Sequence, residues 1–232
     1  MSVIALIPAA GFGTRFHEAG PKALVLLAGR PMLLHALERL AASGRVGGAV
    51  IAVPEGHEDA FHVALKKAPF SCALVGGGVT RRESVARAFA AANLEADDDL
   101  VLVHDAARPL VDSIEVAAVI DAAEKTGAAI AGFSVVETIK RVSGGTVGET
   151  VPRHDLFAAT TPQVFRVGLF RKALLKAEGA DATDDAELVE RAGGTVTVVL
   201  TSRWNIKITY PEDLAWAEAW LAQAGAPSAP TV

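Results

Sequence analysis

The sequence is short of cysteine and of long apolar runs, and neither sign of charge dominates it. Cys72 is the one cysteine among 232 residues, so an internal disulfide is impossible and the chain suits a reducing compartment, the cytoplasm. No apolar run approaches the roughly 18 residues of a membrane span, and the apolar residues 1–10 lack the basic segment of a signal peptide. A net charge of −5 argues against a nucleic-acid-coating surface or a polybasic membrane anchor. We therefore expect no nucleic-acid or membrane partner, and a polyanionic ligand would need a few well-placed cations.

What the chain does contain favours an α/β domain. Hydrophobic residues make up 51% of it, and single α/β domains often reach roughly 200–250 residues. Apolar runs typical of buried parallel strands cover residues 3–8, 48–53, 72–75, 100–104, 128–133 and 195–200. Helical patterns between most of them begin at Pro31, Thr80, Ser113 and Pro211. This alternation predicts a doubly wound, mainly parallel sheet of the Rossmann-like class, in one domain over residues 1–222.

Residues 135–152 break the alternation. Two runs rich in β-branched residues flank Ser143-Gly144-Gly145, a pattern typical of a β-hairpin. A hairpin that projected from the sheet would expose apolar side chains unless a partner subunit covered them. We therefore predict a dimerisation arm at about 135–152 and a homodimer. Residues 223–232, with two prolines and mostly small side chains, are expected to form a disordered tail.

The first candidate site is the loop that follows the first predicted strand. It reads Pro8-Ala9-Ala10-Gly11-Phe12-Gly13-Thr14-Arg15, and Pro21-Lys22 comes after it. Small residues there let backbone N–H groups approach a phosphate, and Arg15 and Lys22 add cations. Ligands of doubly wound sheets bind at the carboxyl ends of the strands, where this loop would lie. A dinucleotide-binding loop is the obvious rival, but Phe16 stands where that pattern needs a third small residue. A tight turn with solvated cations is the plainer alternative.

The second candidate site is the end of a later strand. The segment reads Val101-Leu102-Val103-His104-Asp105-Ala106-Ala107-Arg108-Pro109. Asp105 would present a carboxylate at the same edge of the sheet, and Mg²⁺ prefers one or two carboxylates together with substrate phosphates. Arg108 could bind a phosphate through two hydrogen bonds. The alternative is a helix-capping aspartate beside a solvated arginine.

Two more segments offer polar groups near this edge. Residues 76–78 are glycines that precede a helix capped by Thr80 and Glu83, and they would let a flat base lie against the backbone, with Ser84 nearby. An ordinary strand-to-helix turn explains these glycines equally well. Lys207 stands between two isoleucines, where a strand lysine would normally point to solvent. No Ser-His-Asp or Cys-His set is legible, which favours nucleotidyl transfer, since that chemistry needs mainly positioning and charge neutralisation.

Together these segments resemble the 2-C-methyl-D-erythritol 4-phosphate cytidylyltransferases of non-mevalonate isoprenoid synthesis. The matching motifs are Pro8-Ala9-Ala10-Gly11-x-Gly13, Pro21-Lys22, Gly77-Gly78-x-x-Arg81-x-x-Ser84-Val85, the segment 103–109, Thr161-Pro162-Gln163, Thr183-Asp184-Asp185 and Asn205-Ile206-Lys207. Their order and spacing cover nearly the whole chain and argue strongly against coincidence. Two positions depart from the family: Val79 stands where a polar residue is common, and Ala23 where glutamine is frequent.

The resemblance implies transfer of a cytidylyl group from CTP to a sugar-alcohol phosphate, with Mg²⁺ as cofactor. Catalytic roles would fall to Arg15, Lys22 and Lys207. The nucleotide would bind at Pro8, Ala9, Ala10, Gly11, Gly13, Gly77, Gly78, Ser84, Asp105 and Ala106. The acceptor would bind at Asp105, Arg108, Thr138, Arg153, Thr161, Thr183 and Lys207, with Arg153 supplied by the neighbouring subunit. Asp105 would also serve the metal.

Two other functions fit parts of this pattern. A ribitol 5-phosphate cytidylyltransferase would share most of these loops, but Ala107 and Ala159-Thr160 look more like the methylerythritol enzymes. A non-catalytic nucleotide-binding regulator would be expected to lose Lys22 or Asp105, and both are present.

Overall fold

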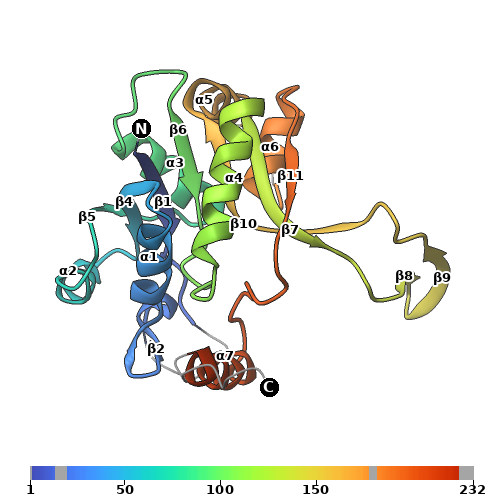
Figure 1. The fold of residues 1–232 in the computed structure, drawn as a ribbon, viewed down its shortest axis with the longest axis horizontal. Coiled ribbons are helices and arrows are strands. Elements are labelled where there is room, and N and C mark those ends of the chain that lie inside the picture. Colours follow the sequence, from blue (N-terminus) through green and yellow to red (C-terminus); the bar gives the residue numbers. More distant parts are fainter. Residues whose placement is uncertain (1, 14–19, 178–181, 225–232) are drawn as a thin grey trace, which may run out of the picture.

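A seven-stranded sheet forms the centre of the molecule (Figure 1). The computed structural model describes residues 2–13, 20–177 and 182–224. The strands of the sheet are β1 (Val3–Pro8), β4 (Val46–Val53), β5 (Ser71–Gly76), β6 (Leu100–Val103), β7 (Ala128–Ser134), β10 (Phe157–Arg166) and β11 (Thr197–Leu200). They lie in the order β11-β7-β10-β6-β1-β4-β5, and β10 runs antiparallel to both of its neighbours while the other pairs are parallel. The predicted doubly wound, mainly parallel sheet is confirmed.

Helices cover both faces of this sheet. Alternate residues of β1 point to opposite faces, so Ala5 and Ile7 pack in one apolar cluster and Leu6 in another. The first cluster takes side chains from α1 (Met32–Ala42), α2 (Glu58–Leu65) and α4 (Ser113–Thr126). The second takes them from α3 (Arg81–Ala91), α5 (Val167–Lys176) and α6 (Asp185–Arg191). Within the described part of the chain, no helix is both long and apolar enough to cross a membrane.

A third, smaller apolar cluster lies where the C-terminal segment returns to the sheet. Helix α7 (Pro211–Ala224) packs there with the short strand β2 (Leu26–Leu27), which pairs with β3 (Arg30–Pro31) and follows the turn η2 (Lys22–Leu24). Ile208 is fully buried in this cluster. The neighbouring Lys207 is thereby anchored. Helix α7 extends two residues into the segment predicted as a tail, whose remainder, residues 225–232, lies outside the described residues.

The sequence patterns do not predict β10, which is inserted between β6 and β7. Polar residues interrupt its apolar pattern, because Thr160, Thr161 and Gln163 are all buried in the middle of the strand. The ladder with β7 is irregular between Ala159 and Gln163, and the Thr161–Pro162 peptide bond is cis. A bulge of this kind turns side chains away from the ladder, and here it directs Thr161 toward the end of β6.

The predicted hairpin is present and projects away from the sheet (Figure 1). Strands β8 (Ile139–Ser143) and β9 (Thr146–Val151) pair in antiparallel fashion across Gly144 and Gly145, whose φ angles are 56° and 80°. These positive angles explain why the turn contains two glycines. Val142 and Val147 are each 56% exposed, so the arm buries little of its apolar surface within this chain.

The two glycine loops at the carboxyl edge of the sheet pack directly against each other. A Cβ added at Gly77 would lie 2.3 Å from the Cβ of Ala10 and 3.2 Å from the Val53 carbonyl oxygen. A Cβ at the adjacent Gly76 would meet nothing within 4 Å. Gly77 therefore permits the close approach of the loops after β1 and β5.

This contact predicts different outcomes for two neighbouring substitutions. Gly77→Ala should lower the free energy of unfolding by about 1–3 kcal/mol, as overpacking does, because the loop of Ala10 must move. Gly76→Ala is the matched control and should remain close to the wild type. Urea unfolding of the three proteins measures the difference, and equal stability of the two variants would contradict the packing argument.

Candidate active site

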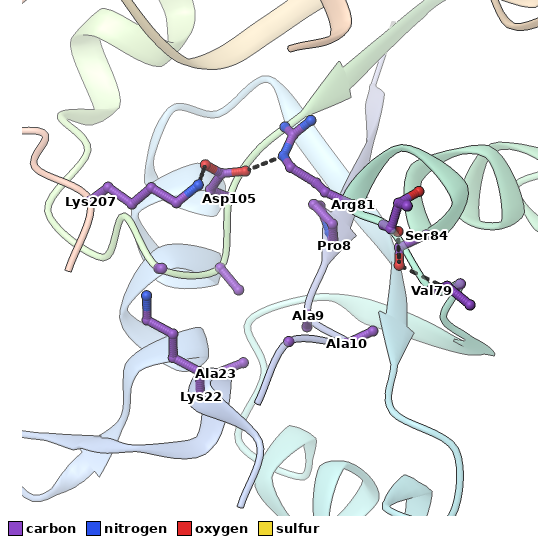
Figure 2. Close-up of a pocket in the computed structure, with 15 residues that line it drawn as sticks. Pro8, Ala9, Ala10, Lys22, Ala23, Val79, Arg81, Ser84, Asp105 and Lys207 are labelled. Carbon is purple, nitrogen blue, oxygen red and sulfur yellow. Dashed lines mark hydrogen bonds and ion pairs between the residues drawn. The ribbon is translucent and has the colours of Figure 1, made fainter. Parts of the chain in front are cut away.

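A cavity of about 260 Å³ lies at the carboxyl edge of the sheet (Figure 2). Residues 8–11 after β1, residues 78–81 with Ser84 after β5, and residues 105–107 after β6 line it. Lys22, Ala23 and Lys207 complete the lining. Of the residues predicted from the sequence, the cavity thus brings together Pro8, Ala9, Ala10, Gly11, Lys22, Gly78, Ser84, Asp105, Ala106 and Lys207.

One wall of the cavity is mostly backbone and small side chains. Lys22 N–H donates to the Gly11 carbonyl at 3.0 Å and holds the base of the loop after β1. Gly78 N–H donates to Ser84 Oγ at 3.1 Å, and that hydroxyl donates to the Thr80 carbonyl at 3.0 Å. One half of the predicted capping box is present, since Thr80 Oγ1 accepts from Glu83 N–H at 3.1 Å. The Glu83 carboxylate, however, accepts from Val79 N–H rather than from the cap residue itself.

The opposite wall is charged and centres on Asp105. Its Oδ1 accepts from Arg81 Nε at 2.8 Å and its Oδ2 from Lys207 Nζ at 2.9 Å, while Arg108 Nε lies 3.7 Å from Oδ2. Burial alone would raise the pKa of Asp105, but the charges of Arg81, Lys207 and Arg108 outweigh it and hold that pKa well below its usual range. Asp105 is therefore ionised, and Lys207 does not point freely to solvent. Figure 2 shows the Lys22 side chain extending toward this group from the opposite loop.

Arg81 links Asp105 to a second, deeper carboxylate. Its Nη1 donates to Asp185 Oδ2 at 2.7 Å, and the Asp185 side chain is 1% exposed at the start of α6. Both residues belong to motifs of the family resemblance, yet neither has a role predicted from the sequence. The position of Arg81 at the start of the helix after the glycines was the one feature of the sequence that could have indicated a role for it. That it reaches across to β6 and α6 follows only from the folded sheet.

The described residues do not fit a metal site held by the protein alone. Asp105 is the one carboxylate among the described lining residues, and both of its oxygens already accept from cations. No group of three or more metal-ligating His, Cys, Asp or Glu side chains occurs in the described ranges. The assignment of Asp105 as a metal ligand stays a prediction, and this geometry does not favour it.

Thr161 and His104 lie behind the cavity wall. Thr161 is 4% exposed, and its Oγ1 accepts from Asp105 N–H at 3.1 Å. His104 is fully buried, and burial lowers its pKa to about 4. In this structure Thr161 therefore supports Asp105 from inside, and its predicted contact with the acceptor stays a prediction.

The remaining predicted residues that the structure describes do not line the cavity of their own chain. Arg153 Nη1 donates to the Val136 carbonyl at the base of the arm, where Thr138 also lies. Thr183 donates through its N–H and its hydroxyl to the Glu187 carboxylate, at 2.6 and 2.9 Å. Gly13 is buried outside the lining, and Arg15 falls outside the described residues.

Comparisons with known proteins agree with this geometry. Residues 3–223 match the family described as 2-C-methyl-D-erythritol 4-phosphate cytidylyltransferase. A relative of that name from Acidobacterium capsulatum is 42% identical over 236 residues, covering 96% of this chain and 98% of the relative. Another from Rhodopirellula baltica is 42% identical over 231 residues, covering 95% of each chain.

Solved structures give the same result. A 2-C-methyl-D-erythritol 4-phosphate cytidylyltransferase from Thermus thermophilus superposes with a TM-score of 0.79 at 36% identity, covering 96% of this chain and all of that one. The enzyme of that name from Francisella tularensis gives a TM-score of 0.81 at 30% identity, covering 95% and 99%. The chain therefore belongs to the 2-C-methyl-D-erythritol 4-phosphate cytidylyltransferase family.

Proposed function

We propose that this chain transfers the cytidylyl group of CTP to 2-C-methyl-D-erythritol 4-phosphate and releases pyrophosphate. The observation that carries the proposal is a cavity with a backbone wall opposite Lys22, Arg81 and Lys207. Such a cavity can hold a flat base on one side and neutralise phosphate charge on the other. Because Cys72 is the one cysteine and no internal disulfide can form, the cytoplasm remains the expected compartment.

The backbone wall suits the cytidine part of CTP. Gly11 faces open space, whereas Gly77 is held tightly against Ala10, so the loops offer a narrow slot with exposed main-chain groups. A pyrimidine edge is small enough for such a slot, and a purine would be crowded. Val79 is 96% exposed at the rim and offers the base no polar side chain, so base recognition rests on the main chain.

The reaction needs no protein nucleophile. The acceptor is a phosphate monoester whose second pKa is near about 6, so at neutral pH it is largely a dianion. One of its oxygens forms a bond to the α-phosphorus of CTP, the bond from that phosphorus to the bridging oxygen breaks, and pyrophosphate leaves with the electron pair. Lys22 and Lys207 stabilise the charge on the phosphoryl oxygens. Asp105 is a poor general base, because three cations hold it in its ionised form.

Mg²⁺ remains part of the proposal. The ion prefers phosphate oxygens, water and one or two carboxylates, and with both Asp105 oxygens engaged it would be held mainly by the phosphates of CTP. Bound there, it would supply further charge neutralisation. The residues of this chain bind and orient the phosphates.

A homodimer is the second part of the proposal. The arm is a separate two-stranded sheet with exposed valines, and an isolated two-stranded hairpin is marginal in water. Packing against the same arm of a second copy across a two-fold axis would bury it. Arg153 follows the arm and lies outside its own cavity, so we place it in the partner's acceptor site, where its guanidinium would bind the phosphate through two hydrogen bonds.

The activity is tested by pyrophosphate release from CTP with each candidate acceptor. The purified protein should turn over 2-C-methyl-D-erythritol 4-phosphate far better than ribitol 5-phosphate, and CTP far better than ATP or GTP. Lys22→Ala should reduce kcat by about a hundredfold or more, because it removes a preorganised cation at the reacting phosphate. Comparable kcat/KM with ribitol phosphate or with GTP would point to a different transferase.

The metal proposal predicts loss of activity in excess EDTA and recovery on addition of Mg²⁺. Asp105→Asn should lower kcat, because it removes the charge that pairs Arg81 with Lys207. It should leave the Mg²⁺ concentration for half-maximal activity nearly unchanged if the ion travels on the CTP phosphates. Full activity in EDTA would remove the metal from the mechanism, and a large rise in the half-maximal concentration would restore Asp105 as a ligand.

Completion of the site by the partner predicts complementation between two inactive variants. Arg153→Ala and Lys22→Ala should each be nearly inactive alone, but heterodimers made by co-refolding should have one intact site. Activity should recover to about a quarter of wild type on random mixing into two-fold dimers. Proven subunit exchange without recovery would place Arg153 in the site of its own chain, or in none.

A further inference from the structure

His104 is a fully buried side chain at the end of β6 to which the proposed reaction gives no role. Both of its ring nitrogens have partners. Nε2 lies 3.1 Å from the Arg108 carbonyl oxygen, and Nδ1 lies 3.1 Å from Thr161 Oγ1. Thr161 Oγ1 in turn lies 3.1 Å from Asp105 N. The imidazole therefore connects the two charged residues of the turn after β6 to a side chain on β10.

The direction of each hydrogen bond follows from its partners. A carbonyl oxygen can only accept, so the proton must be on Nε2, which donates to Arg108. A neutral imidazole protonated at Nε2 has a bare Nδ1, which can only accept, so the Thr161 hydroxyl donates to it. A backbone N–H can only donate, so Asp105 N–H donates to Thr161 Oγ1. This one arrangement satisfies the Asp105 N–H, the Thr161 hydroxyl, both ring nitrogens of His104 and the Arg108 carbonyl.

These hydrogen bonds form a closed ring around the turn after β6, and each donor in the ring points the same way around it. From Asp105 N–H the hydrogen bonds pass through Thr161 and His104 to the Arg108 carbonyl, and Arg108 N–H returns to the Asp105 carbonyl at 3.0 Å. Hydrogen bonds aligned in one direction polarise and strengthen one another. His104 thereby fixes both ends of the turn that carries Asp105 and Arg108.

The same set reaches the segment that carries Lys207. Asn205 Nδ2 donates to the Thr161 carbonyl at 2.6 Å, and Arg108 Nη1 donates to the Asn205 carbonyl at 2.8 Å. By contrast, no side-chain hydrogen bond of His104, Thr161 or Asp105 in the described structure leads to residues 8–11, to residues 78–80 or to Ser84, while Asp105 accepts from Arg81 of the charged wall. The network therefore supports the charged wall of the cavity and leaves the backbone wall to the glycine loops.

We propose that His104, as the neutral tautomer protonated at Nε2, is a positioning residue for acceptor binding. It acts through Thr161 and the Arg108 carbonyl, and it sets where Asp105, Arg108 and Lys207 meet the acceptor phosphate. This inference rests on the proposed function, because it assigns the acceptor to the charged wall. It also commits the single Thr161 hydroxyl proton to His104, so Thr161 has no proton left to donate to a phosphate.

The first test separates acceptor binding from CTP binding. His104→Phe keeps an aromatic ring and removes both nitrogens, so the turn loses the hydrogen bonds of the ring to Thr161 and to the Arg108 carbonyl. KM for the acceptor should rise, or kcat fall, between about tenfold and a hundredfold, as a displacement of about 1 Å can cause. KM for CTP should stay within about twofold. A general loss of stability would not separate the two substrates.

Conservative variants test each of the two ring hydrogen bonds separately and remain informative if His104→Phe folds poorly. His104→Asn keeps an acceptor near the Nδ1 position, and His104→Gln keeps a donor near the Nε2 position. Each should recover part of the lost acceptor binding. Thr161→Val should reproduce the effect of His104→Phe, and the double variant should be no worse than either single one, because residues of one network are not additive.

His35→Phe is the matched control. His35 Nε2 also contacts a backbone carbonyl, that of Leu27 at 2.8 Å, but on α1 and away from the turn. This variant should alter the stability of the protein without changing KM for the acceptor relative to KM for CTP. Ring-nitrogen NMR spectra of the wild type, assigned with His104→Asn, should show His104 protonated at Nε2 and bare at Nδ1.

The outcomes distinguish this inference from the proposed function. Wild-type turnover combined with an unchanged acceptor KM and kcat in His104→Phe and Thr161→Val would overturn the positioning role alone. A proton on Nδ1 in the NMR spectrum would overturn it as well, because the Thr161 hydroxyl could not then donate to the ring. Absence of wild-type turnover with any acceptor would overturn the proposed function and the acceptor assignment together, while the spectrum would still test the network itself.

Discussion

Asp105 holds together three cations that are distant from one another in the sequence. Arg81 comes from the start of α3, Arg108 from the turn after β6, and Lys207 from the segment before α7. A buried carboxylate is costly unless it is paired and hydrogen-bonded, and both oxygens of Asp105 are engaged. With Asp185, whose pKa burial raises, the group contains three cations and at most two negative charges, so it carries an excess of positive charge in a chain whose net charge is −5. That local excess is what a triphosphate and a sugar phosphate require.

The position of this group depends on the register at the end of β6. His104 and Asp105 are adjacent, so they point to opposite sides: the imidazole goes into the protein and the carboxylate into the cavity. A shift of one residue would exchange them and bury an unpaired carboxylate beside Thr161. Pairing of β6 with β1 on one side and with β10 on the other fixes the register. The antiparallel strand β10 is therefore needed to position the charged wall as well as to complete the sheet.

Local sequence patterns predicted the parts of the fold that depend on neighbouring residues. All six predicted apolar runs became strands within two residues of their predicted ends, the glycines of the arm formed a turn, and Thr80 capped α3. The β10 strand was not predictable in this way, because buried Thr161 and Gln163 owe their place to partners on β6 and α6. The same limit applies to the site. Loops near strand ends could be placed together, but the bridge from Arg81 to Asp185 spans 104 positions and exists only in the packed structure.

The two walls of the cavity have different parts: one consists of backbone and small side chains, and the other carries the charged side chains. The described part of the backbone wall comes from one chain, since Gly77 packs against Ala10 and Ser84, and Gly78 N–H donates to Ser84 Oγ. The charged wall is built around Asp105, whereas Thr138 lies at the base of the arm and Arg153 just after it, and neither lines this cavity. A reaction without a covalent intermediate depends on how well its two phosphates are aligned. If the arm pairs with a second copy as proposed, alignment of the acceptor depends on the same contact that would bury the valines of the arm, and assembly and catalysis then share one surface.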